Sequence, residues 1–133
     1  MNKILLFLLF GIFLSSAAMA QTDSLAKEKI YTSVRVIPSF PGGMQAFYRF
    51  LSNTVRYPAE AREHNTQGKV IVSFIVEKDG TLTDFKLMKT VKDGLGEEAM
   101  RVMKLSPKWN PATQNGKAVR VAYSMPISFA LSN

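Results

Sequence analysis

The sequence predicts an α+β fold: a three-stranded antiparallel sheet with two helices packed on one face. Two observations lead to this prediction. Apolar residues recur at helical spacing in two stretches, and they alternate with polar residues in three others. The order along the chain is helix, hairpin, helix, strand. The helices are therefore expected to cover one face of the sheet and to leave the other partly in water.

The two helical patterns are bounded by glycine and proline. The first begins after Pro41-Gly42-Gly43 and ends before Pro58, which moves the preceding residue out of the α region. Its apolar residues are Met44, Phe47, Tyr48, Phe50, Leu51 and Val55. A short helix can follow from Pro58 to His64, since proline suits a first helical turn. The second pattern stops at Pro107. Its apolar face is Leu95, Ala99, Val102 and Met103.

The strands are predicted from alternation. Apolar and polar residues alternate from Val70 to Val76, and Asp79-Gly80 then predicts a hairpin turn, because glycine readily adopts the positive φ that this turn needs. The alternation changes phase before Phe85, which predicts either a bulge or a Leu82 that belongs to the turn. The longest alternation, Val119 to Leu131, predicts a strand of about thirteen residues and over 40 Å.

The first twenty residues have the layout of a secretory signal peptide. Lys3 precedes an apolar run, and Ala18-Met19-Ala20 is an A-x-A cleavage pattern. We expect a signal peptide over residues 1–20 with cleavage after Ala20, a tether over 21–39 that includes a short strand at Ile30–Ile37, and one exported domain over 40–133. A retained leader would instead anchor the chain in a membrane, at the short limit of a spanning helix.

Composition narrows the classes of protein. The chain has no cysteine, which excludes disulfides, cysteine-based metal sites and a lipid-modified cysteine after the leader. Removing Lys3 with the leader lowers the net charge from +7 to +6. Export and the interleaving of Lys and Arg along the chain argue against a nucleic-acid partner. A preference for an acidic polymer such as peptidoglycan stays open.

No set of residues predicts catalysis. His64 is the single histidine and is expected on the surface, with neither a catalytic nor a metal-binding role. Glu97 and Glu98 are adjacent, so they face different directions on a helix and favour its first turn electrostatically. Trp109 is expected in the core, where it packs between a helix end and the sheet. The sequence therefore predicts no enzyme, no metal and no cofactor; a small phosphatase of the acylphosphatase type is the enzyme alternative.

Eight short motifs in order resemble the C-terminal domain of the TonB energy-transducer family. They are Phe40-Pro41-Gly42-Gly43, Tyr57-Pro58-x-x-Ala61, Gly68-x-Val70-x-Val72-x-Phe74-x-Val76, Asp79-Gly80, Leu95-x-x-x-Ala99, Pro107-x-Trp109-x-Pro111, Gly116-Lys117 and Pro126-Ile127-x-Phe129. The first of these looks like an extension seen in TonB-like proteins of the Bacteroidetes type. The resemblance covers about residues 40–131.

The resemblance implies a binding function in support of transmembrane transport. Domains of this family bind an extended segment of outer-membrane receptors, the TonB box, by adding it to the edge of the sheet. In this chain the last strand would supply that edge, through Val119, Arg120, Val121, Ala122, Tyr123, Ser124 and Met125. Pro126 suits an edge, since it has no N–H for a ladder, and is expected to limit the productive segment to these residues. The same edge could support a homodimer.

Two departures from the family pattern bear on energy transduction. The segment before Tyr57, which in the family carries a Gln-Pro pair at the receptor contact, is here Thr54-Val55-Arg56, and we expect it to contact the partner. The tether of about twenty residues reaches about 70 Å and has no proline-rich tract. The leader and the resemblance together imply a binding module in the periplasm. The alternatives are a short transducer anchored in the inner membrane by a retained leader, and a cell-wall-associated protein.

Overall fold

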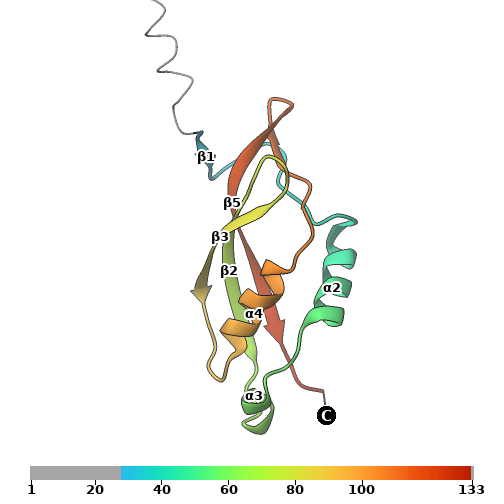
Figure 1. The fold of residues 1–133 in the computed structure, drawn as a ribbon, viewed down its shortest axis with the longest axis vertical. Coiled ribbons are helices and arrows are strands. Elements are labelled where there is room, and N and C mark those ends of the chain that lie inside the picture. The colour runs from blue at the N-terminus through green and yellow to red at the C-terminus, as the bar shows by residue number, and fades with distance from the viewer. Residues whose placement is uncertain (1–27, 133) are drawn as a thin grey trace, which may run out of the picture.

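The computed structural model describes residues 28–132, so the predicted signal peptide and the start of the predicted tether lie outside the described residues (Figure 1). The elements are β1 (Ile30–Tyr31), α2 (Gly43–Thr54), α3 (Ala59–Glu63), β2 (Gly68–Val76), β3 (Leu82–Lys89), α4 (Leu95–Lys104), β4 (Ala112–Gln114) and β5 (Lys117–Phe129). Among these described helices, none combines the length and the apolar character needed to span a bilayer.

The sheet is mixed and larger than predicted. Its strand order is β1-β5-β2-β3, with β4 paired to the start of β5. β2 lies antiparallel to both β3 and β5, whereas β1 runs parallel to β5. The three predicted strands, β2, β3 and β5, pair antiparallel as expected, but the prediction missed β4 and the parallel strand β1. The physical reason is that β5 has thirteen residues and β2 nine, so the start of β5 extends past its partner and is paired by two strands too short to show alternation.

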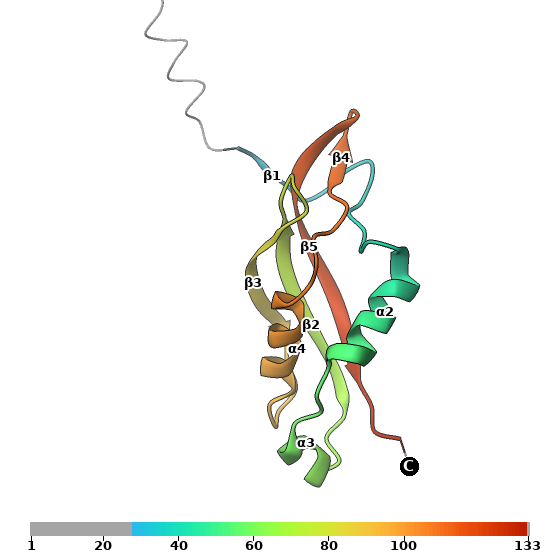
Figure 2. The same cartoon turned by 45° about the vertical axis from the view of Figure 1, so that its right-hand side comes forward.

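Three helices accompany the sheet, two long and one short. α4 packs on β2 and β3, and α2 lies alongside the β5 half of the molecule (Figures 1 and 2). α3 is a single short turn at one end, between α2 and β2. It confirms the short helix expected after Pro58, and α2 and α4 confirm the two longer ones. The strand expected over Ile30–Ile37 shrinks to β1 and one bridge at Val36.

An aromatic cluster joins α2 to the sheet. Trp109 is 4% exposed, and its ring centroid lies 5.4 to 6.1 Å from those of four other aromatic residues. These are Phe40, Phe47, Phe74 and Tyr123. The indole N–H donates to Ser106 Oγ at 2.9 Å, so the buried ring has a partner for its one polar group. The prediction of Trp109 as a core residue is confirmed.

The β2–β3 turn depends on Gly80. Its φ is +90°, and a Cβ built there would lie 1.9 Å from the carbonyl oxygen of Trp109. The same approach lets the Trp109 N–H donate to the Gly80 carbonyl at 2.9 Å. The predicted bulge is also confirmed, because the β2–β3 register shifts between Ser73 and Ile75 and Asp84 has a φ of +53°. Glycine at the turn therefore satisfies both a backbone conformation and a close packing contact.

Candidate functional site

The strands that pair with β5 change along its length. Val119 pairs with β4, and Arg120 and Val121 pair with Ile30 and Tyr31 of β1. From Ala122 to Phe129, β5 pairs with β2 alone among the described strands. The backbone groups that face away from β2 there have no strand partner over eight residues, about 26 Å.

The predicted binding segment therefore divides in two. Its first three residues, Val119, Arg120 and Val121, are already paired with β4 or β1, whereas Ala122, Tyr123, Ser124 and Met125 belong to the open stretch. The open stretch continues past Pro126 to Phe129, and the limit that Pro126 is expected to set on the productive segment stays a prediction. Whether these residues bind a partner stays a prediction.

Pro126 shows which backbone groups face outward. The β2–β5 register runs unbroken from Gly68 to Val76 and includes the pair Ile71–Pro126. A ladder that needed a donor at Pro126 would be interrupted, so the ring nitrogen faces away from β2, as expected of a proline in an edge strand. N–H groups two residues apart point the same way, hence those of Ala122, Ser124 and Ser128 also face outward. Their side chains are exposed, whereas those of Ile127 and Phe129 are buried toward the helices.

A groove lies between α2 and the end of this open edge. Its volume is about 290 Å³, and it is lined by Tyr48, Leu51, Ser52, Val55 and Tyr57 on one side and by Ile127, Ser128, Phe129 and Ala130 on the other. Tyr48 is 60% exposed, although its neighbour Phe47 is fully buried. The groove is thus continuous with the open backbone of β5, and most of its lining is apolar.

An ion pair on α4 holds the segment that leads out of α2. Glu98, which is 8% exposed, accepts two hydrogen bonds of 2.8 Å from the Arg101 guanidinium and a third of 2.5 Å from the Arg56 backbone N–H. Arg101 also donates to the Thr54 carbonyl at 2.8 Å. The Arg101 hydrogen bonds hold the pKa of Glu98 below its usual value despite partial burial, and the Arg56 N–H acts in the same direction.

This contact limits what Thr54, Val55 and Arg56 can offer to a partner. The Thr54 carbonyl and the Arg56 N–H are used within the domain, so the segment ties the end of α2 to α4. Val55 is the member that lines the groove. The sequence placed Glu98 in a first helical turn and missed its role; the spacing of Glu98 and Arg101, three residues apart on one helix, was the available signal.

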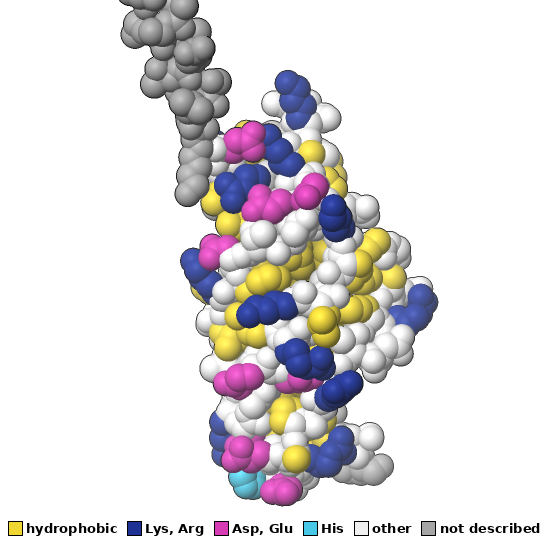
Figure 3. Space-filling model, in the orientation of Figure 1, with side chains coloured by type: hydrophobic (Ala, Val, Ile, Leu, Met, Phe, Trp, Pro, Cys, Tyr) yellow, Lys and Arg dark blue, Asp and Glu magenta, His cyan; other side chains and the backbone are white. Residues whose placement is uncertain are grey.

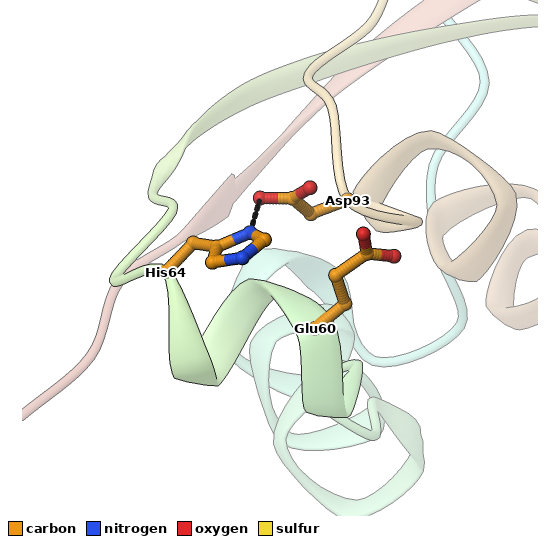
Figure 4. Close-up of side chains that lie close together, drawn as sticks. All are labelled: Glu60, His64 and Asp93. Carbon is orange, nitrogen blue, oxygen red and sulfur yellow. Dashed lines mark hydrogen bonds and ion pairs between the residues drawn. The ribbon is translucent and has the colours of Figure 1, made fainter.

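His64 lies in a separate cluster at the end of the molecule (Figure 4). His64 and Glu60 come from α3 and its cap, Asp93 comes from the segment before α4, and one ligand atom of each lies within 4.8 Å of the others. His64 Nδ1 is 3.1 Å from Asp93 Oδ2, and the Thr66 hydroxyl donates to the same oxygen at 2.5 Å. Thr66, and then His64, lower the pKa of Asp93.

The order of contacts in this cluster does not suit nucleophilic catalysis. A base such as histidine activates a hydroxyl when it lies between the hydroxyl and the carboxylate. Here Asp93 lies between Thr66 and His64, so the hydroxyl donates to the acid and not to the base. The donor set of one imidazole and two carboxylates could hold a divalent cation. The contacts present instead tie α3 to the start of α4.

The fold and this edge define a small α+β domain with a curled, mixed sheet that presents one long strand beside a layer of helices. Comparison with known proteins identifies its family. Residues 53–131 match the model of the Gram-negative bacterial TonB protein C-terminal family. The chain therefore belongs to the TonB C-terminal family.

Individual relatives agree with this assignment. Protein TonB of Helicobacter pylori strain 26695 is 30% identical over 82 residues, which cover 61% of this chain and 27% of that protein. Protein TonB of strain J99 is also 30% identical over 82 residues, with 28% of its length covered. An NMR solution structure of the Helicobacter pylori TonB C-terminal domain superimposes with a TM-score of 0.50 at 28% identity, covering 70% of this chain and 88% of that one. The chain thus spans under a third of these full-length relatives.

Proposed function

We propose that this domain binds outer-membrane TonB-dependent receptors by accepting an extended receptor segment at the outer edge of β5. The observation that carries the proposal is the stretch from Ala122 to Phe129, whose outward backbone groups have no strand partner among the described residues. Membership of the TonB C-terminal family supports the choice of partner.

The proposed contact is transient on energetic grounds. The open stretch has three outward N–H groups, at Ala122, Ser124 and Ser128, and Pro126 supplies a carbonyl without a donor. Four or five backbone hydrogen bonds contribute about 0.5–1.5 kcal/mol each. The total of a few kcal/mol corresponds to a dissociation constant that is micromolar or weaker. Such an affinity suits a handle that engages and releases.

Backbone methylation of the ligand tests strand addition without perturbing the fold of the domain. We would titrate peptides from the TonB boxes of the organism's own receptors into the domain by calorimetry, with three forms of each peptide. The unmodified form should bind, and a form methylated on every amide nitrogen of the segment should not. A form methylated only on the alternate residues whose N–H groups face away from β5 keeps the row of donors that faces β5, and should bind nearly as well as the parent.

Two results would refute the proposal. One is binding that survives complete amide methylation, since strand addition needs peptide donors. The other is the absence of binding by every peptide at high micromolar concentration. Sedimentation should also show a monomer that stays a monomer, because a second copy on the same edge would compete with the receptor segment.

An anchored short transducer is the second candidate, and the position of β1 limits its reach. Since Ile30 and Tyr31 pair with β5, nine residues, Gln21–Lys29, separate the leader from the domain. Fully extended, they span about 30 Å, less than half of the reach expected for the whole tether. An anchored form would hold the domain close to its own membrane. Sequencing the N-terminus of the protein from cells decides between the forms: Gln21 supports the free periplasmic module, and Met1 supports the anchored one.

A further inference from the structure

The groove beside β5 is positioned to contact the side chains of an added strand. Successive side chains of any strand point to opposite faces of its sheet. On the helix side of β5 lie Ile127 and Phe129, both of which line the groove, and on the other face lie the exposed side chains of Ala122 and Ser124. A strand added beyond β5 would therefore direct every second side chain toward α2 and the others toward solvent.

The wall that faces this strand comes from α2. Tyr48, Leu51 and Ser52 line the groove from one face of the helix, and Val55 continues it. Figure 3 shows that hydrophobic side chains gather over the middle of the face that carries the helices, with Lys and Arg around them. The lining is mostly apolar, with the Tyr48 ring exposed above it. An apolar side chain that entered would lose part of its contact with water.

α2 is fixed at both ends, so this wall does not depend on the ligand. At its start, the Gly43 N–H donates to the Phe40 carbonyl at 2.8 Å, and Phe40 packs on Phe47 with ring centroids 5.4 Å apart. At its end, Arg101 and Glu98 bind the backbone of the exit segment. A groove formed in advance binds with less loss of conformational entropy than one that the ligand must order.

The wall also lies almost entirely outside the part of the chain that the family model describes. The model matches residues 53–131, whereas α2 spans Gly43–Thr54 and overlaps it by two residues. The strand edge belongs to the matched region, and most of the helix beside it lies outside that region. The groove can therefore distinguish among strands that the backbone edge alone would bind equally.

We propose that α2 makes the β5 edge selective for an extended segment that carries bulky apolar side chains at every second position, with small or polar residues between them. This proposal rests on the proposed strand addition and names the sequence pattern that the same site selects. Its occupant is a peptide strand, because the groove is continuous with the open backbone of Ile127 to Phe129. Residues Tyr48 and Ser52 set the selectivity from α2.

The test compares two peptides on three forms of the domain. One peptide alternates Leu and Ser over eight residues, and the other has Thr in place of each Leu. Ser52→Trp places a large ring in the groove from an exposed position, and Arg49→Trp, on the same helix and outside the groove lining, is the matched control. Dissociation constants come from calorimetry, and thermal unfolding checks that all three forms are folded.

We expect the wild type to prefer the Leu peptide by about tenfold, as burial of one or two large apolar side chains would produce. The preference should fall below about twofold in Ser52→Trp and persist in Arg49→Trp. Coupling between the Leu-to-Thr change in the peptide and a substitution in the domain shows that the two positions are in contact. An undiminished preference in Ser52→Trp, or a wild type without preference, would overturn the proposal.

The two proposals fail in different ways. If complete amide methylation abolishes binding but Leu and Thr peptides bind alike, strand addition stands and the selective groove falls. If Ser52→Trp abolishes the preference for the Leu peptide but amide methylation has no effect on binding, the groove binds apolar residues and strand addition falls. If neither peptide binds, both proposals are wrong.

Discussion

The two long edges of the sheet differ in how they are exposed. The β3 edge is irregular: Asp84 has a φ of +53°, the register with β2 shifts twice, and Lys86 and Lys89 are exposed on the strand. The β5 edge is regular over Ala122–Phe129, and an apolar groove accompanies its end. Bulges and lysines on an edge strand oppose pairing with another chain. The fold thus discourages strand addition at one edge and leaves the other available.

The largest expected effect comes from the turn that ends β2 and begins β3. Gly80→Ala requires a Cβ at a φ of +90° and 1.9 Å from the Trp109 carbonyl oxygen. We expect a loss of about 3 kcal/mol in the free energy of unfolding, from backbone strain and forced displacement of the Trp109 segment. Urea denaturation followed by Trp109 fluorescence measures it.

Gly116→Ala is the matched control for this prediction. Gly116 also has a positive φ, +75°, in the β4–β5 turn, but a Cβ there meets no other atom within 4 Å. The free energy of unfolding of Gly116→Ala should fall by about 1 kcal/mol, from backbone strain alone. Equal losses in the two variants would show that the close approach of Gly80 to Trp109 does not stabilise the β3 hairpin.

The next effect concerns the ion pair that ties the end of α2 to α4. Glu98→Gln removes the charge that binds Arg101 and the Arg56 N–H. We expect the free energy of unfolding at pH 7 to fall by about 2 kcal/mol. The pKa of Glu98 is lowered in the folded state. Its charge therefore stabilises the fold at pH values above the ordinary glutamate pKa of 4.5. This contribution is lost as the pH falls through the lower pKa of the folded state.

Unfolding of both forms at pH 7 and pH 3 tests this dependence. The difference in free energy of unfolding between wild type and Glu98→Gln should be smaller at the lower pH. Glu97→Gln is the control, since Glu97 is exposed on the same turn and should change stability little. A gap that widens with acidification would contradict the role given to the Glu98 charge.

A smaller effect is expected from restoring a donor to the β5 edge. Pro126→Thr returns an N–H to the outer side of the strand, where Pro126 contributes none. One added backbone hydrogen bond should tighten binding of a receptor peptide by about twofold to tenfold. Ser124→Thr, which changes an exposed side chain and keeps its N–H, should leave affinity unchanged. Calorimetry with the same peptide compares them, and weaker binding by Pro126→Thr would place the peptide elsewhere.

The smallest effect on stability, yet a visible one on association, is expected at β3. Replacing Lys86 and Lys89 by Thr keeps a strand-forming residue and removes the two exposed charges. The free energy of unfolding should change by less than about 0.5 kcal/mol, as for other surface substitutions. Self-association should rise with concentration in sedimentation runs. A variant that stays monomeric would show that the bulges alone protect this edge.

Local patterns predicted the elements well. The alternation around Val70–Val76, the glycine at the turn and the apolar spacing of α2 and α4 were enough to place each helix and long strand. The core position of Trp109 also followed from local features. These features are encoded within a few residues, where helical and strand periodicity or backbone φ decides the outcome. The short strands β1 and β4 could not be predicted, because two or three residues show no periodicity.

By itself, the sequence determined which segments form helices and strands, the family to which the chain belongs and the identity of its longest strand. The tertiary structure alone decided which part of that strand is open. β5 extends past β2, and the overhang is paired by β1 and β4, so the available edge moves toward Phe129. The groove, the Glu98–Arg56 contact and the Arg101–Thr54 contact likewise join groups more than forty residues apart. Such contacts depend on how the elements pack in space, which no local pattern records.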